Sequence, residues 1–196
     1  NRVMRTLFPN ENLDNTKLML YSFGGGQELQ QSLSKDGSLK KWKIPEDWTI
    51  LINMSGGDTE VNPSLKHRVL FFSHDQLTGL DLTMIDILTS VDVLCCKTGY
   101  GVVSEALTAN VPGVLYCDRP GFCEHYLLVQ ALEESLQERC QYVRMWEDVL
   151  HASSDLFESA NKVLEASHLS NRKQKSYPMD GGIRAARFIW EFLTET

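Results

Sequence analysis

A short segment in the middle of this chain combines a lysine, two glycines and a glutamate directly after a run of apolar residues. Residues 97–107 read KTGYGVVSEAL and follow the apolar run 91–96. This spacing predicts a buried strand, a glycine turn and a helix over 102–109. A helix N-terminus presents free backbone N–H groups and favours negative charge, so it suits a phosphate or diphosphate. One turn further on, the Glu105 carboxylate is placed to accept hydrogen bonds from sugar hydroxyls.

The alternative for this segment is purely structural. Glu105 would then complement the helix dipole, and Ser104 would be a hydroxyl of the cap region. We favour ligand binding, because a buried strand that ends in Lys97, two glycines and a Ser-Glu pair is costly unless something uses these polar groups.

Two further segments follow other apolar runs. Gly24, Gly25 and Gly26 come directly after residues 18–23, and three glycines let the backbone approach a ligand closely. A tight turn between a strand and a helix explains them equally well. Arg119 and Glu124 follow the run 114–117 and would lie near the same crevice. For them a surface ion pair is the alternative, and such pairs contribute little.

Histidines outside these segments are assigned structural roles. His74 and Asp75 resemble a catalytic pair, but we place them in a polar loop after the third strand. His125 follows Glu124 on a predicted helix, where we expect a half-buried or surface histidine with its hydrogen bonds satisfied.

The elements that must position these residues alternate between strands and helices. The strands are continuous apolar runs, which are typical of a parallel sheet covered on both faces. We therefore predict an α/β fold, a single Rossmann-like doubly wound domain over 17–196 after a leading segment 1–16. Ligands in such sheets bind outside the carboxyl ends of the strands. The predicted strands span 18–23, 48–54, 69–72, 91–96, 114–117 and 142–143, and the predicted helices span 27–34, 82–88, 102–109, 127–135, 155–166 and 183–193.

Composition argues against several classes of function. The 196 residues have a net charge of −7 and no stripe of lysine and arginine, so we expect no nucleic-acid partner. No apolar run is long enough to span a membrane, and the first residues do not resemble a secretory signal. The five cysteines and five histidines show no metal-ligand spacing, so we expect a reducing cytoplasmic location and no metal.

The motifs resemble a known family. Residues 97–107, Pro112 and the segment RPGFCE at 119–124 resemble the C-terminal, donor-binding half of GT-B glycosyltransferases of the MurG type. They are more similar still to the glycosyltransferase-like region of plant arabinokinases and its bacterial relatives. The similarity extends back to Phe23-Gly24-Gly25 and forward to the Gly-rich segment 181–186.

The resemblance implies a site for a nucleotide sugar. Glu105 would hold the ribose hydroxyls, the backbone of 99–103 the diphosphate, and the backbone near Phe72 and Ser73 the base. Gly25 and Gly26 would approach the phosphate or the sugar, and Glu124 the sugar. Val102 stands where relatives usually have threonine, so the contact to phosphate must fall to the backbone there or be absent. The full predicted set is Gly24, Gly25, Gly26, Phe72, Ser73, Lys97, Thr98, Gly99, Tyr100, Gly101, Val102, Ser104, Glu105, Arg119 and Glu124.

The expected function is that of the donor domain of a metal-independent glycosyltransferase. It would transfer a hexose-type sugar from a nucleoside diphosphate, foremost a UDP-sugar, and would need no other cofactor. The family's acceptor site and usual catalytic base belong to an N-terminal domain, so we expect a missing domain or a partner subunit, and we identify no catalytic residue. Three alternatives are a non-catalytic sugar-nucleotide module attached to a sugar kinase, a split enzyme of two chains, and a non-hydrolysing epimerase.

Overall fold

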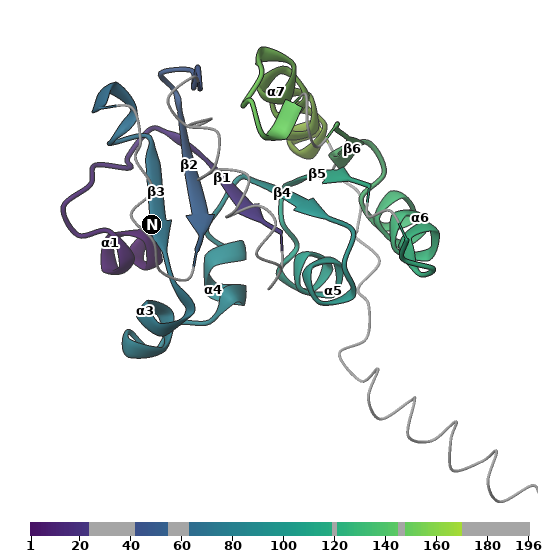
Figure 1. The fold of residues 1–196 in the computed structure, drawn as a ribbon, viewed down its shortest axis with the longest axis horizontal. Coiled ribbons are helices and arrows are strands. Elements are labelled where there is room, and N and C mark those ends of the chain that lie inside the picture. Colours follow the sequence, from purple (N-terminus) through teal and green to yellow (C-terminus); the bar gives the residue numbers. More distant parts are fainter. Residues whose placement is uncertain (24–41, 55–62, 119–120, 145–147, 170–196) are drawn as a thin grey trace, which may run out of the picture.

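Six parallel strands form one sheet in the order β3-β2-β1-β4-β5-β6 (Figure 1). This computed structural model describes residues 1–23, 42–54, 63–118, 121–144 and 148–169. The strand order is that of the doubly wound Rossmann fold, in which the sheet grows outward in both directions from β1. The strands are β1 Lys17–Ser22, β2 Trp48–Asn53, β3 Val69–Phe72, β4 Val93–Lys97, β5 Gly113–Cys117 and β6 Cys140–Tyr142.

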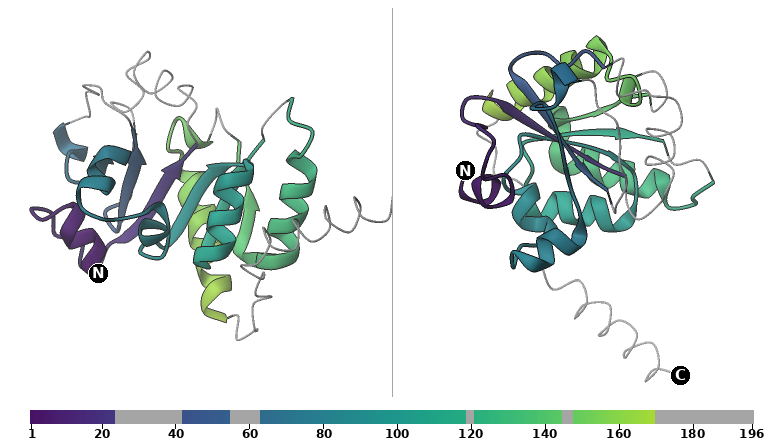
Figure 2. Two further views of the ribbon diagram at one scale, coloured as in Figure 1. Left: turned by 90° about the horizontal axis from the view of Figure 1, so that it is seen from below. Right: turned by 60° about the vertical axis from the view of Figure 1, so that its left-hand side comes forward.

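Helices cover both faces of the sheet, which confirms the predicted α/β class. The right-hand view of Figure 2 shows α7 on one side of the sheet and the other α-helices on the opposite side. The described α-helices are α1 Arg2–Leu7, α3 His74–Gly79, α4 Met84–Leu88, α5 Tyr100–Ala109, α6 His125–Leu136 and α7 Ser154–Leu169, and two 3-10 turns are η2 Pro63–Leu65 and η3 Gln137–Arg139.

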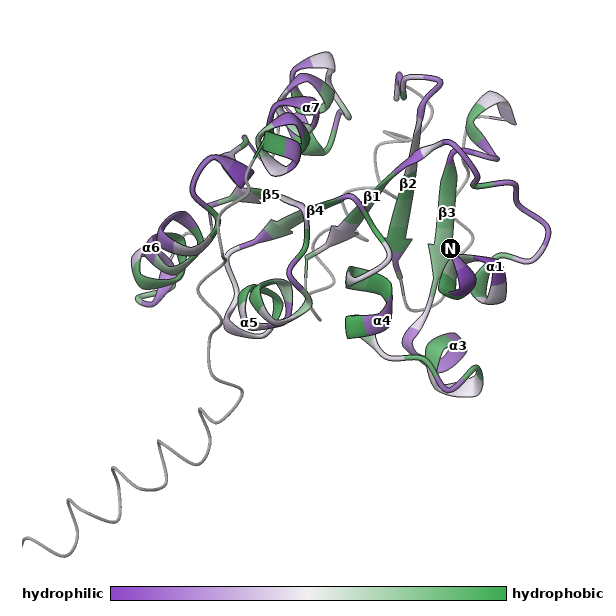
Figure 3. Cartoon of the chain, turned by 180° about the vertical axis from the view of Figure 1, so that it is seen from behind, coloured by the Kyte–Doolittle hydropathy of each residue, from purple (hydrophilic) through white to green (hydrophobic). Residues whose placement is uncertain are grey.

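Alternate residues of the central strands enter two separate hydrophobic cores. Met19 and Tyr21 of β1 belong to the core beneath α7, whereas Leu18 and Leu20 belong to the core beneath α4 and α5. Successive side chains of a strand point to opposite faces, so a strand buried on both sides must be apolar throughout. Figure 3 shows this along β2 and β3, which are hydrophobic over most of their length. This is why the strands were recognisable from the sequence.

Several boundaries differ from the prediction. Helix α5 begins at Tyr100, two residues earlier than expected, because the Val103 N–H already donates to the Gly99 carbonyl at 2.9 Å. The last strand ends at Tyr142 instead of beginning there. The predicted helices 27–34 and 183–193 lie outside the described residues.

Two short helices were not predicted. His74 and Asp75 form the first turn of α3 and do not lie in a loop, because the Ser73 hydroxyl accepts a hydrogen bond from the Gln76 N–H and caps the helix. The leading segment 1–16 contains α1, whose Met4 and Leu7 are buried in the core.

Candidate functional site at the carboxyl edge of the sheet

The two strands on either side of the topological switch point are β1 and β4. They pair directly, with Ser22 opposite Cys96, so their carboxyl ends lie side by side. From β1 the sheet continues to β2 and β3 in one direction, and from β4 to β5 and β6 in the other. The crevice outside such a pair is where Rossmann-type sheets bind ligands. Lys97–Glu105, predicted as the main site, emerges here.

The first turn of α5 presents unused hydrogen-bond donors at this edge. Gly99 is the N-cap residue, has no side chain, and gives no side-chain cap. Within the described residues, the N–H groups of Tyr100, Gly101 and Val102 have no acceptor. The Val102 side chain packs against the core, so its contribution to a site is limited to its backbone. Free N–H groups at the positive end of a helix favour a negatively charged group nearby.

Glu105 lies on the same helix and is half-buried. Among the described residues, no hydrogen bond or ion pair engages its carboxylate. Burial raises the pKa of Glu105 above its usual value, because the charged form loses water without gaining a donor. A ligand that offers hydroxyl donors would supply what the protein does not.

This raised pKa predicts that Glu105→Gln stabilises the unliganded protein near neutral pH. The folded state favours protonated Glu105, so stability falls as pH rises from the usual Glu range through the raised pKa. Glutamine does not ionise, so the variant does not lose this stability as the pH rises. The midpoint of thermal unfolding should rise by up to about 2 °C at pH 7, and the gain should vanish near pH 4.

The matched control for this measurement is Glu165→Gln, a change at an exposed position on α7. Its unfolding midpoint should follow that of the parent chain at both pH values. An equal gain in both variants would mean that the effect is one of net charge and not of Glu105 burial.

A chain of polar side chains joins three neighbouring strand ends. The Thr98 hydroxyl, after β4, is hydrogen-bonded to Nδ1 of His125, the first residue of α6. The other ring nitrogen of His125 lies 3.3 Å from the Asp118 carboxylate, which follows β5. The Tyr142 hydroxyl, at the end of β6, donates to the same carboxylate at 3.0 Å. Thr98 is 0% exposed, so its hydroxyl serves this network.

The network extends beyond the predicted site. His125 is half-buried with both ring nitrogens engaged, as expected, but Asp118 and Tyr142 were not predicted to meet it. One signal was available, because Thr98 and Asp118 each directly follow a parallel strand and must lie on the same edge of the sheet.

The other predicted site residues are distributed as follows. Glu124 is exposed and immediately precedes α6, so it lies beside the network. Phe72 ends β3 and Ser73 follows it, and β2 and β1 separate this strand from β4. The Ser104 hydroxyl donates to the Gly101 carbonyl at 2.9 Å. Gly24, Gly25, Gly26 and Arg119 lie outside the described residues.

Large side chains are exposed around the same edge. Tyr100, which opens α5, is 78% exposed, and Phe122, Tyr126 and Leu127 around the start of α6 are also exposed. The hydrogen bond between Thr98 and His125 joins these two segments at the same edge of the sheet.

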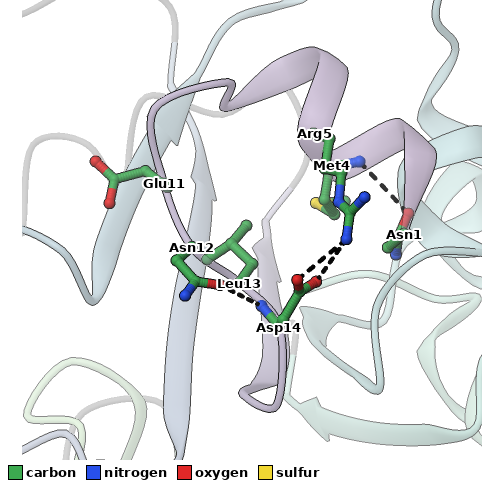
Figure 4. A pocket seen from close by; sticks show the side chains of 7 residues that line it. All are labelled: Asn1, Met4, Arg5, Glu11, Asn12, Leu13 and Asp14. Atoms are coloured by element: carbon green, nitrogen blue, oxygen red, sulfur yellow. Dashed lines mark hydrogen bonds and ion pairs between the residues drawn. The ribbon is translucent and has the colours of Figure 1, made fainter.

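A small pocket lies elsewhere, between α1 and the loop that leads into β1 (Figure 4). Within it Arg5 donates two hydrogen bonds to Asp14, at 3.1 and 3.0 Å. Asp14 precedes β1, and Asn1 contacts the carbonyl of Ser90, which precedes β4. The pocket therefore belongs to the amino ends of the strands, away from the carboxyl edge.

The buried cysteines are unsuited to nucleophilic chemistry. Cys95, Cys96 and Cys117 are free thiols on β4 and β5. Burial raises the pKa of the Cys117 thiol to about 12 and holds those of Cys95 and Cys96 well above the usual range. The thiolate is the reactive form, so these side chains act as small apolar groups.

No cluster of three or more His, Cys, Asp or Glu side chains within the described residues could hold a metal ion. None of the described helices has the length and apolar character needed to cross a membrane.

The fold is that of a Rossmann-type domain in which helix α5 begins at the switch point, with three N–H groups that have no acceptor among the described residues. Comparison with protein-family profiles and with curated proteins found no match for this chain. Among solved structures it is similar to the glycotransferase of kitacinnamycin, at 14% identity and a TM-score of 0.48 over 93% of this chain and 44% of that one. It is also similar to MurG of Acinetobacter baumannii, at 14% identity and a TM-score of 0.48 over 86% of this chain and 51% of that one. The chain thus spans about half the length of these structures.

Proposed function

We propose that this chain is the donor-binding domain of a glycosyltransferase of the GT-B type. It binds a nucleoside-diphosphate sugar, foremost a UDP-hexose, and holds it without a metal while the sugar passes to an acceptor. The sequence resemblance of residues 97–107 and 119–124 to MurG-type enzymes and to the arabinokinase region motivates this proposal.

One observation supports the proposal most directly. The half-buried Glu105 carboxylate has no partner among the described residues, and it lies on the same helix as three N–H groups without acceptors. At 1.5 Å per residue, about 7.5 Å of helix separates Tyr100 from Glu105. A ligand with an anionic group and nearby hydroxyls would give acceptors to the N–H groups and donors to the Glu105 carboxylate. A nucleoside diphosphate is such a ligand.

The domain's part in transfer is positioning and electrostatic stabilisation. The N–H groups of Tyr100, Gly101 and Val102 face the diphosphate, on which negative charge grows as the bond to the sugar breaks. The Glu105 carboxylate fixes the ribose and so orients the diphosphate toward these donors.

Calorimetric titration tests the proposal. The chain is titrated with UDP, GDP, UDP-glucose and uridine, at pH 7.5 and with EDTA present. We expect a diphosphate to bind and uridine to bind much more weakly, because the helix N-terminus recognises the anion. Absence of binding by every nucleotide would refute the proposal.

Gly101 provides a sharper test of the diphosphate position. A Cβ added at Gly101 would meet nothing within 4 Å, and alanine is a better helix former than glycine. Gly101→Ala should therefore raise the unfolding midpoint. It should also weaken diphosphate binding by about tenfold, since the methyl group occupies space that a ligand needs beside the free N–H groups.

Gly79→Ala is the matched control. Gly79 is also a helical residue, the last one of α3, and a Cβ added there would also meet nothing within 4 Å. It should leave diphosphate affinity unchanged. Equal affinity of the parent chain and Gly101→Ala would place the diphosphate elsewhere.

The exposed side chains of Tyr100, Phe122, Tyr126 and Leu127 favour a second form of the proposal, in which a further domain or partner subunit completes the site. In that case the chain alone should bind UDP-glucose without releasing UDP. Turnover by the isolated chain would exclude this form, as well as the purely regulatory module.

A further inference from the structure

The hydrogen-bonded bridge through His125 is the feature of this edge that nucleotide contacts leave unexplained. His125 begins α6, yet its two ring nitrogens reach segments that follow two different strands, Thr98 after β4 and Asp118 after β5. Thr98 is fully buried one residue before Gly99, the N-cap of α5. A shift of Thr98 would therefore also shift the start of α5.

We propose that His125 is a positioning residue for the nucleotide site. By holding Thr98, it fixes the turn between β4 and α5, so that the N–H groups of Tyr100, Gly101 and Val102 stay directed at one point. The bond to Asp118 holds the ring itself, and Asp118 is in turn held by Tyr142. The effect on the ligand rests on the proposed function, whereas the effect on the turn does not.

The physical reason lies in what the turn lacks. Gly99 has no side chain to cap α5, and its N–H donates to the Lys97 carbonyl at 2.9 Å. A free helix terminus frays unless tertiary contacts hold it. The buried hydroxyl of Thr98 would also be left without a partner if His125 were removed, and such a group is costly to bury.

Two substitutions separate the halves of the bridge. The side-chain amide of asparagine occupies the place of Nδ1, so His125→Asn keeps a partner for Thr98 and loses Asp118. The amide of glutamine reaches the place of Nε2, so His125→Gln keeps Asp118 and loses Thr98. Thr98→Val removes the hydroxyl at nearly constant volume, and His67→Gln, at an exposed histidine paired with Glu11, is the matched control.

The readouts are amide hydrogen exchange over residues 99–103 and UDP affinity. In His125→Gln and Thr98→Val we expect faster exchange and about 2- to 10-fold weaker binding. His67→Gln should match the parent chain in both, and His125→Asn, which loses the Asp118 contact but keeps a partner for Thr98, should be affected less than His125→Gln. The double variant His125→Gln/Thr98→Val should be no worse than either single one, because both remove the same bond.

The outcomes distinguish this inference from the proposed function. If the parent chain binds no nucleotide, the proposed function fails, and the exchange rates alone decide whether His125 holds the turn. Unchanged exchange in His125→Gln overturns the inference. Weaker binding in His125→Asn and His125→Gln alike, with exchange unchanged, also overturns it, since His125 would then contact the ligand directly.

Discussion

Glu105→Ala is expected to lower the affinity for a nucleoside diphosphate by about 10- to 100-fold. The carboxylate has no partner among the described residues, so its hydrogen bonds to the ribose hydroxyls would be gained entirely on binding. Hydrogen bonds to a charged group contribute about 1.5–3 kcal/mol, which corresponds to this range. Calorimetric titration with UDP at pH 7.5 measures the change.

A chemical counterpart makes this test specific to the ribose. The 2′,3′-dideoxy form of UDP lacks the hydroxyls, so the parent chain should bind it as weakly as Glu105→Ala binds UDP. Combining variant and analogue should bring little further loss. Glu165→Ala on α7 is the control and should bind as the parent chain does. Equal affinity of Glu105→Ala and parent for UDP would reject the ribose role.

Gly113→Ala is expected to lower the unfolding midpoint by about 3 to 10 °C. A Cβ on Gly113 would lie 2.6 Å from Cγ2 of Val163 on α7 and 3.3 Å from its Cβ. Valine in a helix has essentially one rotamer, so the contact can be relieved only by moving α7 away from β5. Overpacking of this kind costs about 1–3 kcal/mol. Thermal unfolding followed by circular dichroism measures the loss.

Removing the opposing methyl groups should reverse part of this loss. Val163→Ala creates space beneath α7, so Gly113→Ala/Val163→Ala should be more stable than the sum of the single effects predicts. Strictly additive losses would show that the strain lies somewhere other than this contact. Gly101→Ala, where a Cβ meets nothing within 4 Å, is the glycine control.

The sequence predicted the central strands well because each of them is buried on two faces, whereas β6, whose predicted bounds differed, has no buried residue. β1, β2 and β4 are continuous apolar runs bounded by polar or glycine residues, and no helix of ordinary amphipathic pattern has that composition. Helix α3 was missed for the opposite reason. Leu77 is its one buried residue, so it has no apolar periodicity, and its start depends on the Ser73 cap.

The candidate site was predictable where it is local in sequence. The helix N-terminus and Glu105 lie within one segment, and their spacing alone brings them together. The bridge from Thr98 through His125 to Asp118 was not predictable, because its members come from three segments whose approach depends on how α6 packs against β6 and α5. Strand order places the segments at one edge, but only side-chain packing selects which of them touch.

The pairing of β1 with β4 has a kinetic consequence. Met19 lies opposite Val93, so the pairing of these strands closes a long loop of the chain. Such contacts cost loop-closure entropy and are slow to form. A ligand bound outside the carboxyl ends of β1 and β4 depends on contacts that are complete only in the native state. Its binding should therefore lengthen the lifetime of the folded chain and leave the refolding rate nearly unchanged.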